Sequence, residues 1–116
     1  MTQLPEQTTT IVLNLQRRLL AIINHATAAG YIILEEYGET EATLIDLEQL
    51  QNAGVRAQTY YSRFYTLLLR IAESQPRATT AMLELLARTI EEAHYTADAL
   101  EATVQEVKSD WDIYYD

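Results

Sequence analysis

The pair of residues that comes closest to a metal-binding motif is Glu91 and His94, an E-x-x-H pair in the last third of the chain. Carboxylate-bridged di-metal sites in helical bundles use two such pairs together with two further glutamates. His25 is the second histidine of the chain, and no glutamate stands three residues before it. One chain therefore cannot complete the site. A metal role requires a dimer that supplies two copies of Glu91 and His94, with Glu92 or other carboxylates completing the ligand set.

A second cluster of carboxylates is Glu35-Glu36-Tyr37-Gly38-Glu39. It resembles the E-E-x-x-E half of the magnesium site of all-α nucleotide pyrophosphohydrolases, which implies an E-x-x-D partner within a few turns. No glutamate lies between Glu48 and Glu73. The chain also has no cysteine, which excludes a thiol nucleophile and cysteine metal sites. Because it has no glycine-rich phosphate loop either, we expect a protein that is not an enzyme and needs no cofactor.

Three arginines stand seven residues apart at Arg56, Arg63 and Arg70, a spacing that places them on one face of a helix. A row of guanidinium groups suits phosphates or an acidic protein partner. The alternative is that these arginines pair with carboxylates of a neighbouring helix, the candidates being Glu84, Glu91 and Glu92. Tyr60 and Tyr65 belong to the same segment and flank its predicted core positions. Exposed aromatic side chains are common at interfaces, so we include both tyrosines in a partner-binding surface.

The end of the chain, residues 109–116, alternates acidic residues with large apolar ones. Trp111 falls on the apolar repeat of the last helix and can cap the core, whereas Tyr114 and Tyr115 lie beyond it. Amphipathic acidic ends of this kind can dock on a partner groove with a basic rim. We therefore assign Trp111, Tyr114 and Tyr115 to partner binding as well.

The arginine-rich segment overlaps a pattern that resembles the turn and recognition helix of TetR-type helix-turn-helix regulators. The residues that match the family pattern A-G-V-x-x-x-T-x-Y-x-x-F are Ala53, Gly54, Val55, Thr59, Tyr61 and Phe64. The resemblance implies DNA binding by residues 47–66, with Arg56, Thr59, Tyr60 and Arg63 facing the major groove. The formal net charge of −9 opposes this function, because affinity for nucleic acid comes mainly from neutralised phosphates.

Three segments that position these side chains have apolar residues at alternating steps of three and four, which is typical of helices packed along one seam. The predicted seams are Val12, Leu15, Leu19, Ile22, Ala26, Ala29 and Ile33; then Leu47, Leu50, Gly54, Ala57, Tyr61, Phe64, Leu68 and Ile71; then Leu83, Leu86, Ile90, Ala93, Ala97, Leu100, Val104, Val107 and Trp111. We predict an all-α antiparallel bundle of three long helices forming a single domain, residues 1–116. Breaks at Gly30 and Gly54 would give four or five helices.

The connections between the helices are also predicted from local sequence. Gly38 suits the position after a helix end and Thr40 the next N-cap, while Pro76 suits the first turn of the third helix. If the second connection lies near residue 75, facing positions have numbers that sum to about 150. Gly54 then meets Ala97, and Ala57 meets Ala93.

The first helix carries a second apolar row beside its seam, at Leu13, Leu20, Ile23 and Leu34. A wide apolar face requires cover on more than one side, which two neighbouring helices do not easily give. We therefore expect a homodimer through the first helix.

Charge is unevenly distributed along the chain, with six acidic and no basic residues in 35–48 and most arginines in 49–83. Antiparallel packing gathers the carboxylates at one end of the bundle. The N-terminus does not resemble a signal peptide, and the longest uncharged stretch, residues 19–34, is too short and polar to span a membrane. We expect a cytoplasmic, non-enzymatic protein–protein interaction module, whether adaptor, assembly chaperone or inhibitor.

Overall fold

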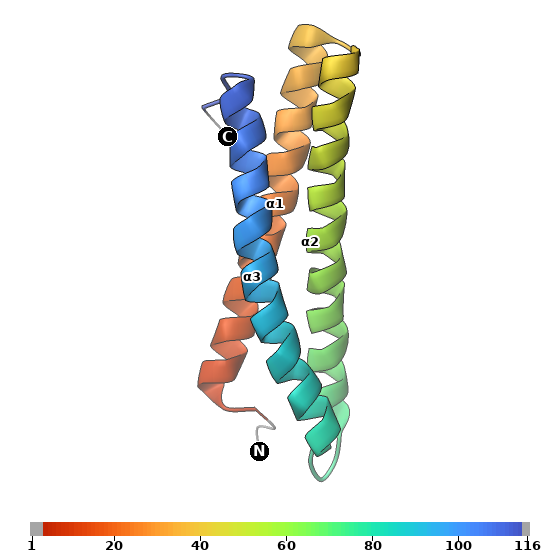
Figure 1. Cartoon of the computed structure of the whole chain (residues 1–116). Helices are drawn as coiled ribbons and strands as arrows, with labels where there is room; N and C mark the ends of the chain where they lie inside the picture. Colours follow the sequence, from red (N-terminus) through yellow and green to blue (C-terminus); the bar gives the residue numbers. More distant parts are fainter. Residues whose placement is uncertain (1–3, 115–116) are drawn as a thin grey trace.

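The computed structural model describes residues 4–114 and contains three long α-helices (Figure 1): α1 (Glu6–Tyr37), α2 (Glu41–Glu73) and α3 (Thr80–Asp110). They lie side by side in a rod of 56 × 21 × 19 Å. Each helix contacts both others, and α1 packs more extensively against α2 than against α3. This confirms the predicted all-α antiparallel bundle.

The connection between α1 and α2 is built as predicted. Gly38 follows the last turn of α1 with a φ of 70°, a left-handed conformation that favours glycine. Thr40 is the N-cap of α2, and its side chain accepts a hydrogen bond from the backbone N–H of Thr43 at 3.1 Å. The Thr43 hydroxyl in turn accepts from the backbone N–H of Thr40 at 2.7 Å. This reciprocal capping box fixes the start of α2.

The prediction for Pro76 was wrong. Pro76 lies in the connection between α2 and α3, and the third helix begins four residues later at Thr80. Its N-cap is Thr79, whose side chain accepts a hydrogen bond from the N–H of Met82 at 3.1 Å. A threonine hydroxyl satisfies an N–H of the first turn, and this local bond sets the boundary.

Both helices with an internal glycine are continuous. Gly30 lies inside α1, where a Cβ atom added to it would stand 3.5 Å from Leu47 Cδ2 of α2. Gly54 lies inside α2, and a Cβ atom added to it would have no atom within 4 Å apart from its chain neighbours and the nearby backbone of α2. The bundle therefore has three helices, because tertiary packing outweighs the roughly 1 kcal/mol helix penalty of a single glycine.

The apolar core confirms the seam of α1 at every position and corrects that of α2. The seven predicted α1 residues are its seven buried residues. In α2 the buried residues are Thr43, Leu50, Ala53, Ala57, Phe64, Leu67 and Ile71. Gly54, Tyr61 and Leu68 are only half-buried. The predicted meeting of Gly54 with Ala97 was wrong, since Ala53 takes the buried position.

In α3 six of the nine predicted seam residues are buried, namely Leu86, Ala93, Ala97, Leu100, Val104 and Val107. Ile90 and Trp111 are half-buried, whereas Leu83 is exposed. Thr89 joins the core, and its hydroxyl donates to the backbone carbonyl of Leu85 at 2.7 Å.

No helix within residues 4–114 has the length and apolar character needed to cross a membrane.

Candidate interaction surfaces

One side of the bundle, formed by α1 and α2, carries two rows of side chains without any charge. The α1 row is Leu13, Gln16, Leu20, Ile23, Thr27, Tyr31 and Leu34; the α2 row is Leu44, Leu47, Gln51, Val55, Gln58, Ser62, Tyr65 and Leu69. Both follow the helical repeat of three and four residues. The rows contain eight of the fifteen exposed large apolar side chains found among residues 4–114. We call these two rows the uncharged face.

A groove of about 290 Å³ marks the centre of this face, between α1 and α2. Its lining is uncharged and comprises Ile23, Ala26, Thr27, Gly30, Leu47, Leu50, Gln51, Gly54, Val55 and Gln58. Gly30 and Gly54 lie in this groove, and their missing side chains leave the space open. Gly54 thus faces the side shared with α1, which explains why it does not contact α3.

The three arginines spaced by seven, Arg56, Arg63 and Arg70, are exposed on α2. Within residues 4–114, no carboxylate oxygen lies within 4.0 Å of any of them. The alternative that they pair with Glu84, Glu91 and Glu92 was therefore wrong. The Arg63 guanidinium carbon lies 5.0 Å from the centre of the Tyr60 ring, a cation–π distance. We call these three arginines and Tyr60 the arginine stripe.

The structure separates the two tyrosines that the sequence grouped together. Tyr60 is half-buried and lies against Arg63 of the arginine stripe. Tyr65 stands five positions further on, about 140° around the helix, and is 59% exposed on the uncharged face. The predicted partner-binding residues of α2 therefore belong to two distinct surfaces.

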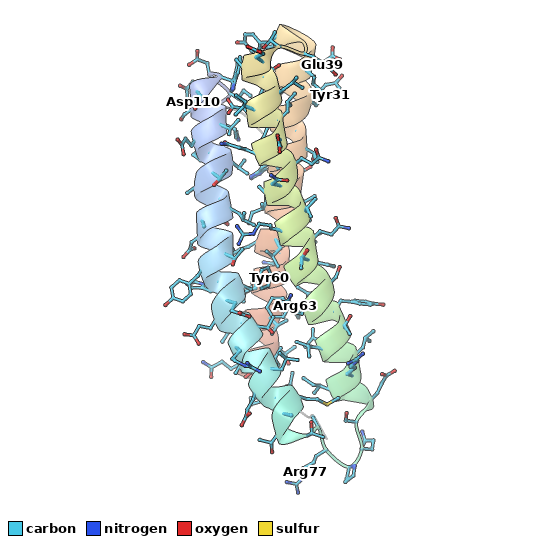
Figure 2. The ribbon with its side chains drawn as sticks, turned by 45° about the vertical axis from the view of Figure 1, so that its right-hand side comes forward. Tyr31, Glu39, Tyr60, Arg63, Arg77 and Asp110 are labelled. Carbon is cyan, nitrogen blue, oxygen red and sulfur yellow. The ribbon has the colours of Figure 1, made fainter. Side chains whose placement is uncertain are left out.

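At the end of the bundle where α1 connects to α2, Trp111 joins all three helices. Its ring centre lies 4.7 Å from that of Tyr37 at the end of α1. Its indole N–H donates to the Asp46 carboxylate of α2 at 2.6 Å. Trp111 therefore caps the core, and much of its surface is used within the chain. Tyr114 is exposed, and Tyr115 lies outside the described residues. Figure 2 shows Glu39 and Asp110 at this end and Arg77 at the opposite tip.

An ion-pair cluster between α1 and α3 was missed from the sequence. Arg18 donates to Glu101 through Nε at 3.1 Å and Nη2 at 2.7 Å, and to Asp98 through Nη2 at 2.7 Å. These hydrogen bonds to carboxylates raise the pKa of Arg18 above its ordinary value. The hydrogen bond from Arg18 likewise lowers the pKa of Asp98. Asp98 and Glu101 stand 80 and 83 positions from Arg18 in the sequence, and only the lateral fit of α1 against α3 brings them together.

The same cluster includes His94 of the E-x-x-H pair. Its Nδ1 atom lies 3.4 Å from Arg18 Nη1, and its Nε2 atom lies 3.9 Å from an Asp98 oxygen. A guanidinium beside the imidazole repels a metal cation. No group of three histidine, aspartate or glutamate side chains within residues 4–114 has a metal-binding arrangement.

Residues 47–66, which resemble a helix-turn-helix, all lie within the continuous helix α2. The backbone does not turn at Ala53-Gly54-Val55. Recognition by a helix-turn-helix requires two helices joined at a sharp angle, so this stretch lacks the geometry that the resemblance implied.

Comparisons of the chain with protein-family models, with curated proteins and with solved structures found no match in any of the three.

Proposed function

We propose that this chain is a cytoplasmic, non-enzymatic protein–protein interaction module that forms a homodimer through α1 together with α2. The observation that carries the proposal is the uncharged face. Charged residues make up 22% of the chain, yet the fifteen positions of this face contain none. Depletion of charge around exposed apolar side chains is typical of the core of a protein interface.

The size of the uncharged face supports a stable interface. The α1 row extends from Leu13 to Leu34, which spans about 32 Å at 1.5 Å per residue. Two adjacent helices, each about 10 Å wide, give roughly 600 Å² per copy. This approaches the ~800 Å² per partner of an ordinary specific interface.

The second part of the proposal is recognition of acidic protein segments by the arginine stripe. Arg56, Arg63 and Arg70 have no carboxylate partner among residues 4–114, so their hydrogen-bond donors are available to a partner. Guanidinium groups bind carboxylates in a bidentate manner. At the other end, Tyr114 and the carboxylates around Trp111 form a complementary acidic surface for a basic segment.

Sedimentation equilibrium of the wild type and of two matched variants tests the homodimer. Leu20 on the uncharged face is 50% exposed, and Leu85 on α3, away from this face, is 41% exposed. We expect the wild type and L85E to be dimers and L20E to be a monomer with unchanged helicity by circular dichroism. The reason is that a glutamate at position 20 would be buried without a partner. A dimer of unchanged affinity in L20E would contradict the proposal.

A further inference from the structure

The two ends of the bundle differ strongly in charge. The half formed by residues 20–58 and 100–114 carries ten acidic and two basic side chains. The half formed by residues 4–19 and 59–99 carries six of each. We call them the acidic half and the arginine half. Figure 2 shows Glu39 and Asp110 in the first, and Arg63 and Arg77 in the second.

Two copies that meet through the uncharged face with their helices aligned can be related by a two-fold axis in two ways. An axis along the helices gives a parallel dimer, in which the two acidic halves lie next to each other. An axis across the helices gives an antiparallel dimer, in which each acidic half lies next to an arginine half. The first arrangement concentrates like charges and the second disperses them, so electrostatics favours the antiparallel dimer.

Charges along the edges of the uncharged face indicate where the axis lies. On the outer side of α2, Glu41 and Glu48 precede Arg63 and Arg70, and all four are exposed. The pairs Glu48–Arg63 and Glu41–Arg70 have the same midpoint, between residues 55 and 56. An axis at this level therefore places each glutamate opposite an arginine of the second copy.

The outer edge of α1 indicates nearly the same level. Arg17 and Glu35 are exposed and stand eighteen residues apart, which is five helical turns. Their midpoint is Ala26, so an axis at this level places Arg17 of one copy opposite Glu35 of the other. Ala26 and Val55 both line the groove at the centre of the uncharged face. Three charge pairs on two helices thus point to one position.

From this agreement we infer that the dimer is antiparallel, with its two-fold axis at the groove. The acidic segment bound by Arg63 and Arg70 is then the Glu41–Glu48 segment of a second copy. This inference rests on the homodimer proposed above and adds its orientation and the partner of Arg63 and Arg70.

Distances between spin labels on the two copies test the orientation. The chain has no cysteine, so a single introduced cysteine carries the only label of each copy. Asn24, near the axis and exposed on α1, is the reporter of dimerisation, and Glu39, at the acidic end, is the reporter of orientation. Pulsed electron–electron double resonance on N24C and on E39C gives the two distances.

For an antiparallel dimer we expect a distance below about 20 Å, two helix diameters, in N24C. In E39C we expect about 40 Å, twice the rise of the thirteen residues from Ala26 to Glu39. Short distances in both variants would show a parallel dimer and overturn this inference while leaving the homodimer intact. The absence of intermolecular coupling in both would contradict the homodimer itself.

Charge exchange tests the proposed edge contacts independently. We expect R63E and E48R each to raise the dimer dissociation constant about threefold to tenfold, since each places like charges opposite one another. The double variant R63E/E48R restores opposite charges and should bind within about twofold of the wild type. A double variant weaker than either single variant would show that Glu48 and Arg63 do not face each other.

Discussion

At the scale of single residues, Asp112 is the one residue other than glycine with a positive φ among residues 4–114. Its φ of 55° is left-handed, and it follows the end of α3. The N–H of Ile113 donates to the Lys108 carbonyl at 2.7 Å and the N–H of Asp112 to the Ser109 carbonyl at 3.2 Å, which together form a Schellman motif. Ile113 is buried by this turn.

Glycine suits this left-handed position better than aspartate, and removal of a negative charge from a helix C-terminus is also favourable. We expect D112G to raise the free energy of unfolding by about 0.5–1 kcal/mol, measured by urea denaturation. The control D112N removes the charge but keeps a residue that tolerates φ > 0 less readily than glycine. A D112G variant less stable than the wild type would contradict this account of the helix end.

Asp98 provides a prediction of pH dependence. The hydrogen bond from Arg18 lowers its pKa in the folded protein, whereas the unfolded chain has the ordinary value of about 3.9. The contribution of Asp98 to stability is therefore present above about pH 4 and is lost as the pH falls through the lowered pKa. We expect D98N to lower the Tm at pH 7, with a difference from the wild type that shrinks towards pH 2. A pH-independent difference would show that the charge of Asp98 is not the cause.

At the scale of helices, the sequence was sufficient to predict the buried row of α1, because this row, from Val12 to Ile33, is apolar at every position, whereas the row beside it is interrupted by Gln16 and Thr27. The sequence was insufficient to predict which side of α2 is buried, because two adjacent rows of this helix are apolar. One row contains Leu47, Gly54, Tyr61 and Leu68, and the other contains Ala53 and Leu67. Both satisfy the same repeat, and only the position of α3 decides which is buried. The same lateral fit creates the Arg18 cluster, which no local pattern could predict.

The two glycines inside helices give a prediction at this scale. A Cβ at Gly30 would make ordinary van der Waals contact with Leu47, and one at Gly54 would meet no atom within 4 Å beyond its chain neighbours and the nearby backbone of α2. We expect G30A and G54A each to stabilise the folded chain by about 0.5–1 kcal/mol through helix propensity. Urea denaturation in the L20E background measures this effect without a contribution from dimerisation. A loss of stability in G54A would show that α2 requires glycine for another reason.

At the scale of the whole molecule, the acidic half carries an excess of eight negative charges confined to one half of a 56 Å rod. The contacts of Trp111 with Tyr37 and Asp46 hold the helix ends of the acidic half together, against repulsion among the exposed carboxylates. Repulsion between solvated charges is screened beyond about 10 Å at 0.1 M salt. The folded chain should therefore gain stability as salt is added.

We expect the Tm of the L20E monomer to rise between 10 and 300 mM sodium chloride, because repulsion across the acidic half exceeds the attraction within the Arg18 cluster. The triple variant E35Q/E36Q/E39Q, made in the same background, removes three of these charges. It should have a higher Tm at 10 mM salt and a smaller increase with salt. Differential scanning calorimetry measures both. If E35Q/E36Q/E39Q has a lower Tm than its parent at 10 mM salt, the carboxylates of the acidic half stabilise the bundle. Repulsion among them would then not destabilise it.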